Sequence, residues 1–444
     1  MTASQGTEYV LKRASEAGVG FIGLWFTDAA GRHKTVDITL AQLEAALADG
    51  VAFDGGSMVG AARAEERDFR LLPDPETFAV LPWRRDLRVG RMFCDLVNDR
   101  GEPSHHDGRS ILKRTLDTAA RAGRRFYAAA ELEGYYFRGA SLPPVRVDGG
   151  SYFDALPADD LIQVRREIVV ALEELGIAVE QTHHEVGPGQ YEIKLGYANP
   201  LALADALVTA RYAAKLFARR RGLLASFMPK PLEGQPGSGL HMTLSMGRQE
   251  EAAGGAPASV DAVADDADAS GLNLTGRSFL AGLLEHARAL TLITNPTVNS
   301  YKRLGHGGEA PSRCTWTRSN WADLVRVPSA RAEHGGRGTI EYRAPDPSCN
   351  PYLALAVLLA AGQDGVSRGL SAPPMRAPGT DAVAVPSLPE TLTAAADLAA
   401  GSPFLEAAIG APLRDTLVEV ARREWRAYNA QVSPWELARY FEAL

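Results

Sequence analysis

The chain has 444 residues, of which 45% are hydrophobic and 23% charged, so it is long enough for two or three domains of an ordinary globular protein. Its net charge of −7 excludes a general nucleic-acid-binding surface, which would be basic. The three cysteines, Cys94, Cys314 and Cys349, are widely spaced, which excludes a disulfide framework and a cysteine-based zinc site. Residues 1–6 carry no secretory signal and no apolar run approaches the roughly 20 residues of a membrane span, so we expect a cytoplasmic protein without a membrane partner.

The first hundred residues are typical of a small α+β domain. A hairpin is predicted because two apolar strands flank a turn at Ala30-Gly31. Residues 98–103 have the composition of a linker, so we place the N-terminal domain at residues 1–103. Its predicted elements, in chain order, are the hairpin over 20–38, a helix capped by Thr39 that runs through Ala48, and short strands at 77–81 and 88–96.

From residue 104 onward, predicted helices and strands alternate, and we assign residues 104–444 to a larger second domain. Two of the helices begin with Asn-Pro, a capping residue followed by a first-turn proline. Residues 250–271 are rich in Ala, Gly and Asp and are predicted to form an exposed insertion, and residues 371–388 form a proline-rich excursion. The predicted helices are 109–122, 159–175, 201–221, 278–291, 351–363 and 411–428.

Four later stretches place acidic or imidazole side chains on one face of a predicted strand. Side chains alternate along a strand, so Glu131 and Glu133 share a face, and the reversal at 187–190 can bring Glu185 and Glu192 together. A single Glu-x-Glu or His on a strand is more often solvated or structural, but these lie among apolar residues, where carboxylates are costly without cations. Together they favour hard divalent cations, which commonly manage phosphate. The candidate ligands are Glu131, Glu133, Glu185, Glu192, His241 and Glu341.

Motifs with a fixed order and spacing extend along nearly the whole chain. They are Phe53-Asp54-Gly55-Gly56-Ser57, Glu131-Leu132-Glu133, residues 183–192, 227–231, 237–241 and 299–304, and residues 345–353. On these motifs the chain resembles the glutamine synthetase family. Residues 235–239 and 307–311 look closest to paralogues that glutamylate polyamines. The resemblance implies an α+β fold, with a β-grasp-like N-terminal domain and a catalytic domain in which helices surround a curved antiparallel sheet.

The resemblance also assigns the six candidate ligands to two divalent ions, Mg²⁺ or Mn²⁺. One ion would lie near the amino-acid substrate and the other at the phosphates of ATP. Glu133, Glu185 and Glu192 match the ligands of the first ion, and Glu131, His241 and Glu341 match those of the second.

Substrate and catalytic roles follow from the same resemblance. Arg303 and Arg343 match arginines that neutralise glutamate and its developing phosphate, and the backbone of Gly237 would approach this substrate. Asp54 matches an aspartate that helps to deprotonate the incoming ammonium across a subunit contact. Glu309 matches a glutamate in a flap that closes the site and keeps water from the acyl phosphate.

On the ATP side, Tyr197 and Ser245 match positions that flank adenine, and Arg326 matches an arginine that stabilises the phosphates during transfer. Three other phosphate-facing positions depart from the family pattern. They are Thr243, where the family has a second histidine, and Trp321 and Thr339, each in place of an arginine. Arg313, Arg318 and Arg337 lie near in sequence and are candidates to replace the lost charge.

The function expected from these residues is ATP-dependent ligation of the γ-carboxyl of glutamate to an amine through γ-glutamyl phosphate, with a polyamine or small alkylamine favoured. One alternative is an authentic glutamine synthetase that uses ammonia. Another is a catalytically altered or inactive homologue with a regulatory role. The resemblance further implies a homododecamer of two hexameric rings, in which a helical tail after Ser433 grips the facing ring.

Overall fold

The computed structural model describes most of the chain, and helices, strands and contacts are reported for that part alone. The described residues are 3–55, 68–84, 87–159, 161–251, 257–261, 263–265, 268–305, 310–320, 322–328, 338–377 and 385–444.

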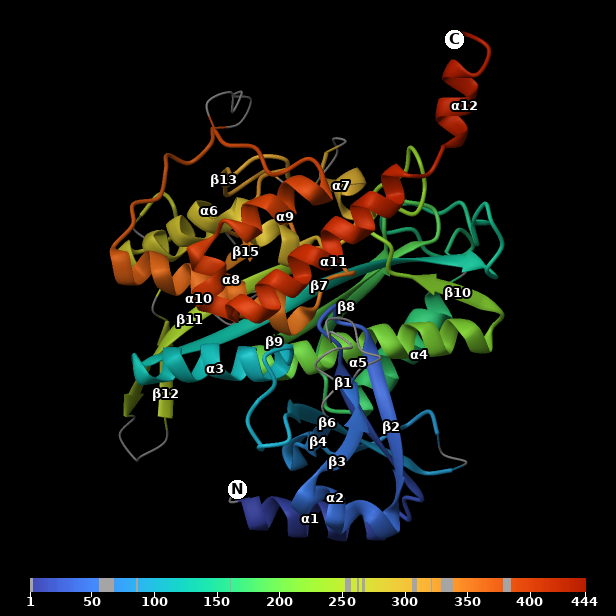
Figure 1. The fold of residues 1–444 in the computed structure, drawn as a ribbon, viewed down its shortest axis with the longest axis vertical. Helices are drawn as coiled ribbons and strands as arrows, with labels where there is room; N and C mark the ends of the chain where they lie inside the picture. Colours follow the sequence, from blue (N-terminus) through green and yellow to red (C-terminus); the bar gives the residue numbers. More distant parts are fainter. Residues whose placement is uncertain are drawn as a thin grey trace.

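The N-terminal domain is built on a six-stranded sheet in the order β2-β1-β6-β4-β3, with β5 paired to β6. β1 and β6 are parallel, and the other pairs are antiparallel. Two helices close this sheet at the lower end of the molecule (Figure 1). The elements are α1 (Ala3–Glu16), β1 (Phe21–Thr27), β2 (His33–Thr39), η1 (Leu40–Gln42), α2 (Leu43–Asp49), β3 (Val51–Asp54), β4 (Asp68–Pro73), η4 (Pro75–Thr77), β5 (Ala79–Val80) and β6 (Val89–Val97).

The predicted hairpin is confirmed by the pairing of β1 with β2. The helix expected after Thr39 begins as the short 3₁₀ turn η1, and the Thr39 side chain makes no capping hydrogen bond. Helix α1 was not predicted from the sequence. It is held to the domain by Val10 and Ala14, which are fully buried.

The second domain is built on a nine-stranded sheet in the order β13-β14-β15-β11-β7-β9-β8, with β10 paired to β7 and β12 to β11. Its pairs are antiparallel except β13 with β14. The strands are β7 (Arg124–Arg138), β8 (Val179–His184), β9 (Gln190–Ala198), β10 (Leu223–Ser226), β11 (Leu240–Glu251), β12 (Pro257–Asp261), β13 (Trp316–Thr317), β14 (Val325–Arg326) and β15 (Ile340–Tyr342). Part of the insertion predicted at 250–271 is paired strand, because β11 continues to Glu251 and pairs with β12.

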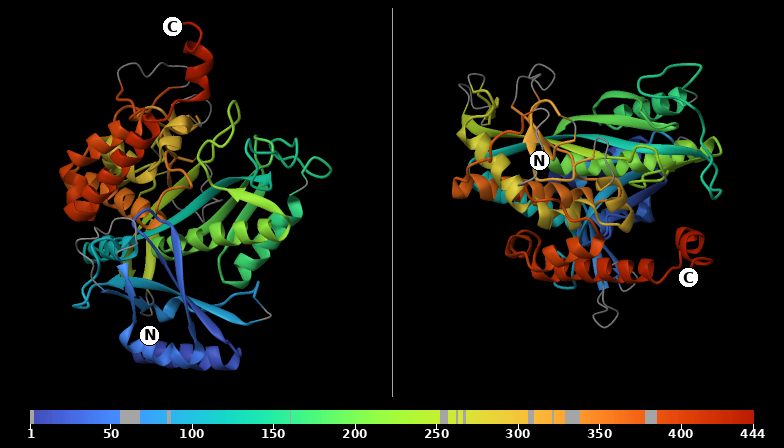
Figure 2. Two further views of the ribbon diagram at one scale, coloured as in Figure 1. Left: turned by 45° about the vertical axis from the view of Figure 1, so that its right-hand side comes forward. Right: turned by 90° about the horizontal axis from the view of Figure 1, so that it is seen from above.

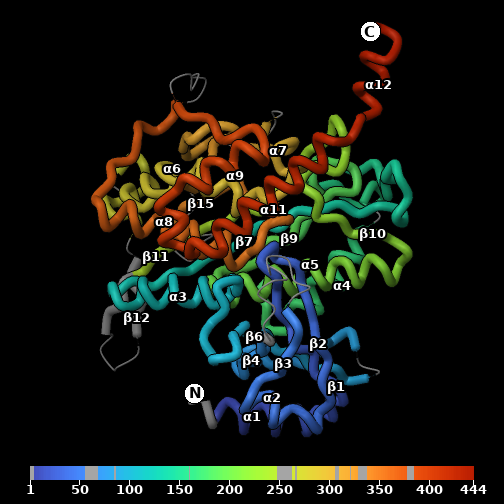
Figure 3. Tube along the Cα trace, in the orientation of Figure 1, coloured from blue at the N-terminus to red at the C-terminus, as the bar shows by residue number. Residues whose placement is uncertain are grey.

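Helices accompany this sheet, and α12 stands clear of the rest of the fold at the C-terminus in every view (Figures 1 and 2). The chain passes from β6 of the N-terminal domain into α3 beside the large sheet (Figure 3). In the described part of the chain, no helix is both long and apolar enough to cross a membrane. The helices are α3 (Gly108–Arg121), α4 (Ile162–Glu174), α5 (Pro200–Arg220), α6 (Leu274–Thr294), α7 (Val298–Leu304), α8 (Pro351–Arg368), α9 (Leu392–Ala400), α10 (Pro403–Ile409), α11 (Ala411–Asn429) and α12 (Pro434–Tyr440).

The six predicted helices are thus confirmed within a few residues at each end. The two Asn-Pro starts are also confirmed. The Asn199 side chain accepts a hydrogen bond from the Leu201 amide, and the Asn350 side chain accepts from the amides of Tyr352 and Leu353. Each cap satisfies amide groups that the first turn of a helix leaves without a partner.

Alternation along the central strands divides the large sheet into an apolar face and a polar face. On β7, Ala130 and Leu132 belong to the main hydrophobic core, and Phe126 on the same face packs against Phe279 of α6. Glu131 and Glu133 point from the opposite face of β7. The sheet therefore presents its charged residues together on the face that the core does not occupy.

An aromatic cluster joins the two domains. Trp25 of β1 lies 4.9 Å from the Tyr212 ring of α5, and His33 of β2 packs against both rings, at 4.4 and 5.3 Å between centroids. The Nε2 atom of His33 is buried and has no hydrogen-bond partner. Burial, together with the positive charges of Arg211, Lys215 and Arg91, lowers the pKa of His33 to about 4.

The aromatic contact between the two domains should stabilise the protein less in acid, because His33 becomes protonated there. Its pKa is lower in the folded protein than the usual 6.5, so its contribution to stability is present above pH 6.5 and is lost as the pH falls toward 4. At pH 5 we expect a loss of about 2 kcal/mol relative to pH 8. Urea denaturation of the wild type and of His33→Phe at both pH values measures this loss, and the variant should lack it. Equal acid sensitivity in both proteins would contradict the prediction.

Candidate metal and nucleotide site

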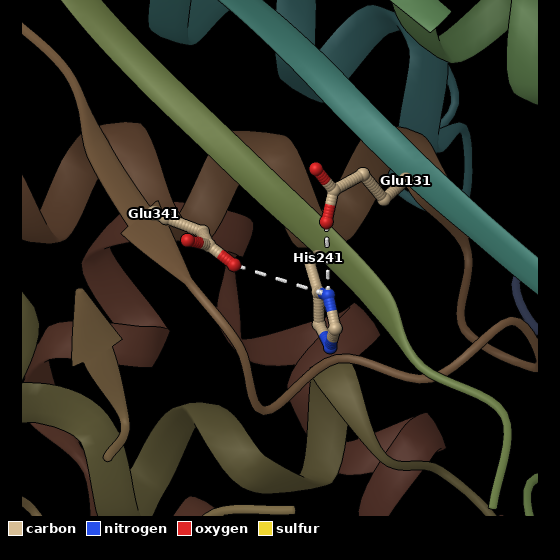
Figure 4. A group of neighbouring side chains, drawn as sticks. All are labelled: Glu131, His241 and Glu341. Atoms are coloured by element: carbon tan, nitrogen blue, oxygen red, sulfur yellow. Dashed lines mark hydrogen bonds and ion pairs between the residues drawn. The ribbon is translucent and has the colours of Figure 1, made fainter. Parts of the chain in front are cut away.

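Two carboxylates and one imidazole from three neighbouring strands converge at the centre of the polar face (Figure 4). Glu131 of β7 lies directly across from His241 of β11, and Glu341 is supplied by β15, which pairs with the other side of β11. The Nδ1 atom of His241 is 3.2 Å from Glu131 Oε2 and 3.9 Å from Glu341 Oε1. One ligand atom from each residue lies within 4.8 Å of the others, a spacing that fits one metal ion. We call Glu131, His241 and Glu341 the His241 cluster.

A second group of ligand atoms with the same spacing comes from His183, Glu185 and Glu192, which we call the His183 cluster. His183 of β8 lies across from Glu192 of β9. The Nε2 atom of His183 is 3.3 Å from Glu192 Oε1, and its Nδ1 atom is 3.5 Å from Glu185 Oε1. The reversal between Glu185 and Glu192 thus brings both carboxylates to one histidine.

Glu133 lies between the two clusters. Its Oε1 atom is 3.8 Å from His241 Nε2, and its charge acts on both Glu185 and Glu192. Its Oε2 atom accepts hydrogen bonds from Gln190 Nε2 and from the Gly239 amide. The sequence grouped Glu133 with Glu185 and Glu192, whereas the structure places His183 with that pair and leaves Glu133 adjacent.

The electrostatics of the His183 cluster fit a cation. Burial and the neighbouring charges of Glu133 and Glu192 raise the pKa of Glu185 to about 8. Burial and the charges of Glu131 and Glu133 likewise raise the pKa of Glu192 well above its usual value. Carboxylates that repel one another in a buried site become favourable ligands once a divalent ion neutralises them.

The His241 cluster already has cations at its carboxylates. Burial raises the pKa of Glu131, but the His241 hydrogen bond and the charges of Lys194 and Arg343 outweigh it and hold the value at about 2. Glu341 accepts hydrogen bonds from Arg343 Nη1 and, at 3.0 Å, from Arg326 Nη1. This cluster is therefore suited to a metal that arrives with an anionic ligand.

Arg303 and Gly237 lie beside Glu133, on the side of the site where the sequence predicts the amino-acid substrate. The buried Arg303 guanidinium donates hydrogen bonds to the carbonyls of Arg343, Ala344 and Pro345. A Cβ atom on Gly237 would come within 2.8 Å of Arg303 Cγ and 2.7 Å of a backbone oxygen, so only glycine allows this close approach. The Gly237 backbone therefore packs directly against Arg303.

The predicted adenine side is neutral and polar. The Ser245 hydroxyl is buried on the face that carries His241, and it makes no hydrogen bond. Tyr197, at the end of β9, lies near Thr339, and burial raises the pKa of this tyrosine. Thr243 is buried between His241 and Ser245 on the same face of β11. All four of these hydroxyl side chains can offer hydrogen bonds to a nucleotide, but they carry no charge.

Not every predicted residue belongs to this face. Asp54 lies at the end of β3, in the six-stranded sheet rather than the nine-stranded one. Glu309, Trp321 and Arg337 lie outside the described residues. Arg318 donates to the Ala269 carbonyl and Arg313 to the Val385 carbonyl, so both arginines contact other segments of the chain.

Sequence reasoning missed three residues of the site: His183, Gln190 and Lys194. Gln190 donates to Glu133 and to the Gly237 carbonyl, and its side-chain oxygen accepts from Tyr135 and from the Gly187 amide. The alternation that paired Glu131 with Glu133 would also have selected His183, two residues before Glu185. Lys194 likewise follows Glu192 by two positions on β9.

Comparison with known proteins is consistent over the whole chain. A family model described as "Glutamine synthetase, catalytic domain" matches residues 105–440, and one described as "Glutamine synthetase, beta-Grasp domain" matches residues 18–99. Proteins named glutamine synthetase from Mycolicibacterium smegmatis and Mycobacterium tuberculosis are each 39% identical over 98% of both chains. The glutamine synthetase of Thermotoga maritima is 38% identical over 98% of this chain and 99% of its own.

Solved structures give the same result at the level of the fold. Two structures described as "Apo GmaS without ligand" and "GmaS/ADP complex-Conformation 1" superpose with TM-scores of 0.84 and 0.85. They are 29% and 30% identical to this chain, and the match covers 98% of this chain and 99% of each of theirs.

Proposed function

Because the chain belongs to the glutamine synthetase family, a family of ATP-dependent ligases, we propose that it joins the γ-carboxyl of glutamate to an amine through γ-glutamyl phosphate. The amine we favour is a small alkylamine or a polyamine. We assign the chemistry to residues 104–444, with residues 1–103 as a separate N-terminal domain that carries Asp54.

The observation that carries this proposal is the pair of adjacent ligand clusters on one sheet face, with Glu133 between them. Their donors are carboxylate oxygens and imidazole nitrogens, which suit Mg²⁺ or Mn²⁺. We propose that Glu133, Glu185 and Glu192 hold one ion near glutamate, with His183 beside them. The His241 cluster would hold the second ion at the ATP phosphates, and the two ions would offset the charge that crowds the phosphoryl group.

In this proposal the remaining side chains bind the two substrates, neutralise the charge of the phosphoryl group and exclude water from the site. Arg326 and Arg343 lie at Glu341 and would stabilise the phosphoryl group during transfer. Arg303 and the Gly237 backbone would hold glutamate. Tyr197 and Ser245 would flank adenine, and Ser245 would gain the hydrogen-bond partner that its buried hydroxyl lacks.

Two residues are proposed to act on the amine. Asp54 would accept a proton from the incoming ammonium group from a neighbouring subunit, because it lies on the six-stranded sheet of its own chain. Glu309 would close the site as part of a flap. A homododecamer is proposed to supply that neighbour. The exposed side chains of Trp435, in α12, and Phe441, which follows α12, would then become buried in it. The mass of the particle in solution tests this assembly.

The structural neighbours favour an alkylamine over ammonia. Their name, GmaS, stands for gamma-glutamylmethylamide synthetase, and their fold covers nearly all of this chain. The proteins named glutamine synthetase are more similar in sequence, at 38–39% identity, and they support ammonia as the second candidate. The amine is therefore the part of the proposal that an assay must decide.

ADP release with glutamate decides between the candidates. The purified chain is incubated with ATP, Mg²⁺ or Mn²⁺, and glutamate, and then with ammonia, methylamine, ethylamine, putrescine or spermidine in turn. We expect kcat/KM for an alkylamine or polyamine to exceed that for ammonia. A preference for ammonia would establish the second candidate, and no release with any amine would reject the ligase.

A further inference from the structure

A row of charged side chains crosses the polar face of the catalytic sheet. Neighbouring strands β9, β7, β11, β15 and β14 contribute to it in that order. At one end, Lys194 of β9 lies across from Glu131, and its Nζ atom is 3.3 Å from Glu131 Oε1. At the other end, Arg326 of β14 lies across from Glu341, and its Nη1 atom is 3.0 Å from Glu341 Oε2. The His241 cluster of Figure 4 is therefore bracketed by a cation on each side.

Lys194 is enclosed rather than solvated. Its side chain is 16% exposed, and its Nζ atom is also 3.7 Å from Glu180 Oε2 on β8. A lysine on an open surface gains little from such pairs and seldom keeps one geometry. Here Glu131 on β7 and Glu180 on β8, the two strands that flank β9, hold the Lys194 ammonium at the edge of the proposed phosphate site.

The side chains on the nucleotide side of the site supply little positive charge of their own. Thr243 and Thr339 are buried and neutral on the side of the site where nucleotide would lie. Arg318 is directed to the Ala269 carbonyl instead. A triphosphate brings about four negative charges to a face that already holds the carboxylates of Glu131 and Glu341.

We propose that Lys194 is a phosphate-binding residue that supplies positive charge to the β- and γ-phosphates from the side opposite Arg326. This inference rests on the proposed use of ATP. A divalent ion on Glu131 would neutralise the carboxylate that now holds Lys194. The flexible four-carbon stem of Lys194 then lets its ammonium group turn toward a phosphate oxygen. The ammonium is a compact charge, which suits it to bind phosphate.

Nucleotide binding tests the role directly. Lys194→Met keeps most of the stem and removes the charge, whereas Lys194→Arg restores a cation. Calorimetry with Mn²⁺ compares AMP-PNP, which carries all three phosphate positions, with AMP. We expect Lys194→Met to weaken AMP-PNP binding roughly 10- to 100-fold and to change AMP binding less than about twofold. Lys194→Arg should recover most of the loss.

A matched control is Lys215→Met on α5, since the Lys215 ammonium lies 5.8 Å from the centre of the Phe227 ring and away from the clusters. This variant should bind AMP-PNP as the wild type does. Circular dichroism and the thermal midpoint show whether each variant is folded, and Lys194→Gln replaces Lys194→Met if the latter does not fold.

Two results would overturn the role of Lys194. Unchanged AMP-PNP affinity, with tighter Mn²⁺ binding in the absence of nucleotide, would mean that Lys194 only neutralises Glu131 until a metal arrives. Equal losses for AMP and AMP-PNP would mean a general disturbance of the pocket. If the wild type itself binds no AMP-PNP, the proposed function fails as well, so the two failures are distinguishable.

Discussion

Glu341→Gln should lower ligase turnover by at least roughly 1000-fold, because it removes one of two carboxylates from the His241 cluster. Glutamine keeps the size of the side chain but binds a hard divalent ion weakly. It also removes the carboxylate that pairs with the guanidinium of Arg343, whose side chain is 1% exposed. ADP release measures turnover, and calorimetry with Mn²⁺ in the presence of AMP-PNP measures the ion that this cluster would hold.

A change in folding must be separated from a change in metal binding. Glu173→Gln on the exposed surface of α4 makes the same chemical change away from the site and should be silent. The thermal midpoint of Glu341→Gln reports any cost of removing the carboxylate that pairs with the Arg343 guanidinium. If Glu341→Gln is folded and keeps both Mn²⁺ affinity and turnover within tenfold, the His241 cluster is not the site of phosphoryl transfer.

Local chemistry predicted much of this fold. The hairpin of β1 and β2, the Asn-Pro helix starts and the polar face of β7 all follow from patterns within a few residues. Helix α1 gave no such signal, because it begins at the third residue and has no acidic first turn. Its support comes instead from Val10 and Ala14, which pack into the core of the N-terminal domain.

The contacts between strands in the site could not be predicted from local sequence patterns. Alternation indicates that Glu192 and Lys194 share a face, but it does not say which residue lies across from them. The pairing of Lys194 with Glu131 depends on the register of two strands about sixty residues apart. The same long-range register brings His183 to Glu192. The contacts of Lys194 with Glu131 and of His183 with Glu192 were therefore visible only in the folded chain.

Gly365→Ala should destabilise the protein by about 3 kcal/mol or more, although alanine is the better helix former. Helices α6 and α8 cross in backbone contact at Gly282 and Gly365. A Cβ atom on Gly365 would lie 2.1 Å from the Ser278 carbonyl oxygen and 2.7 Å from the Gly282 nitrogen. Neither backbone atom can move without separating the two helices, so the clash outweighs the gain in helix propensity. Urea denaturation measures the change in the free energy of unfolding.

The consequence should extend to the polar face. α6 packs on β7 through Phe279 and Phe126, and α7, which carries Arg303, follows α6 closely in the chain. We therefore expect Gly365→Ala to weaken glutamate binding as well as stability, and Gly365→Val to do both more strongly. Gly149→Ala is the control, because a Cβ atom there would meet nothing within 4 Å and its backbone is not in the left-handed region. Equal stability of Gly365→Ala and Gly149→Ala would show that the two helices can part at little cost and that their contact does not position the site.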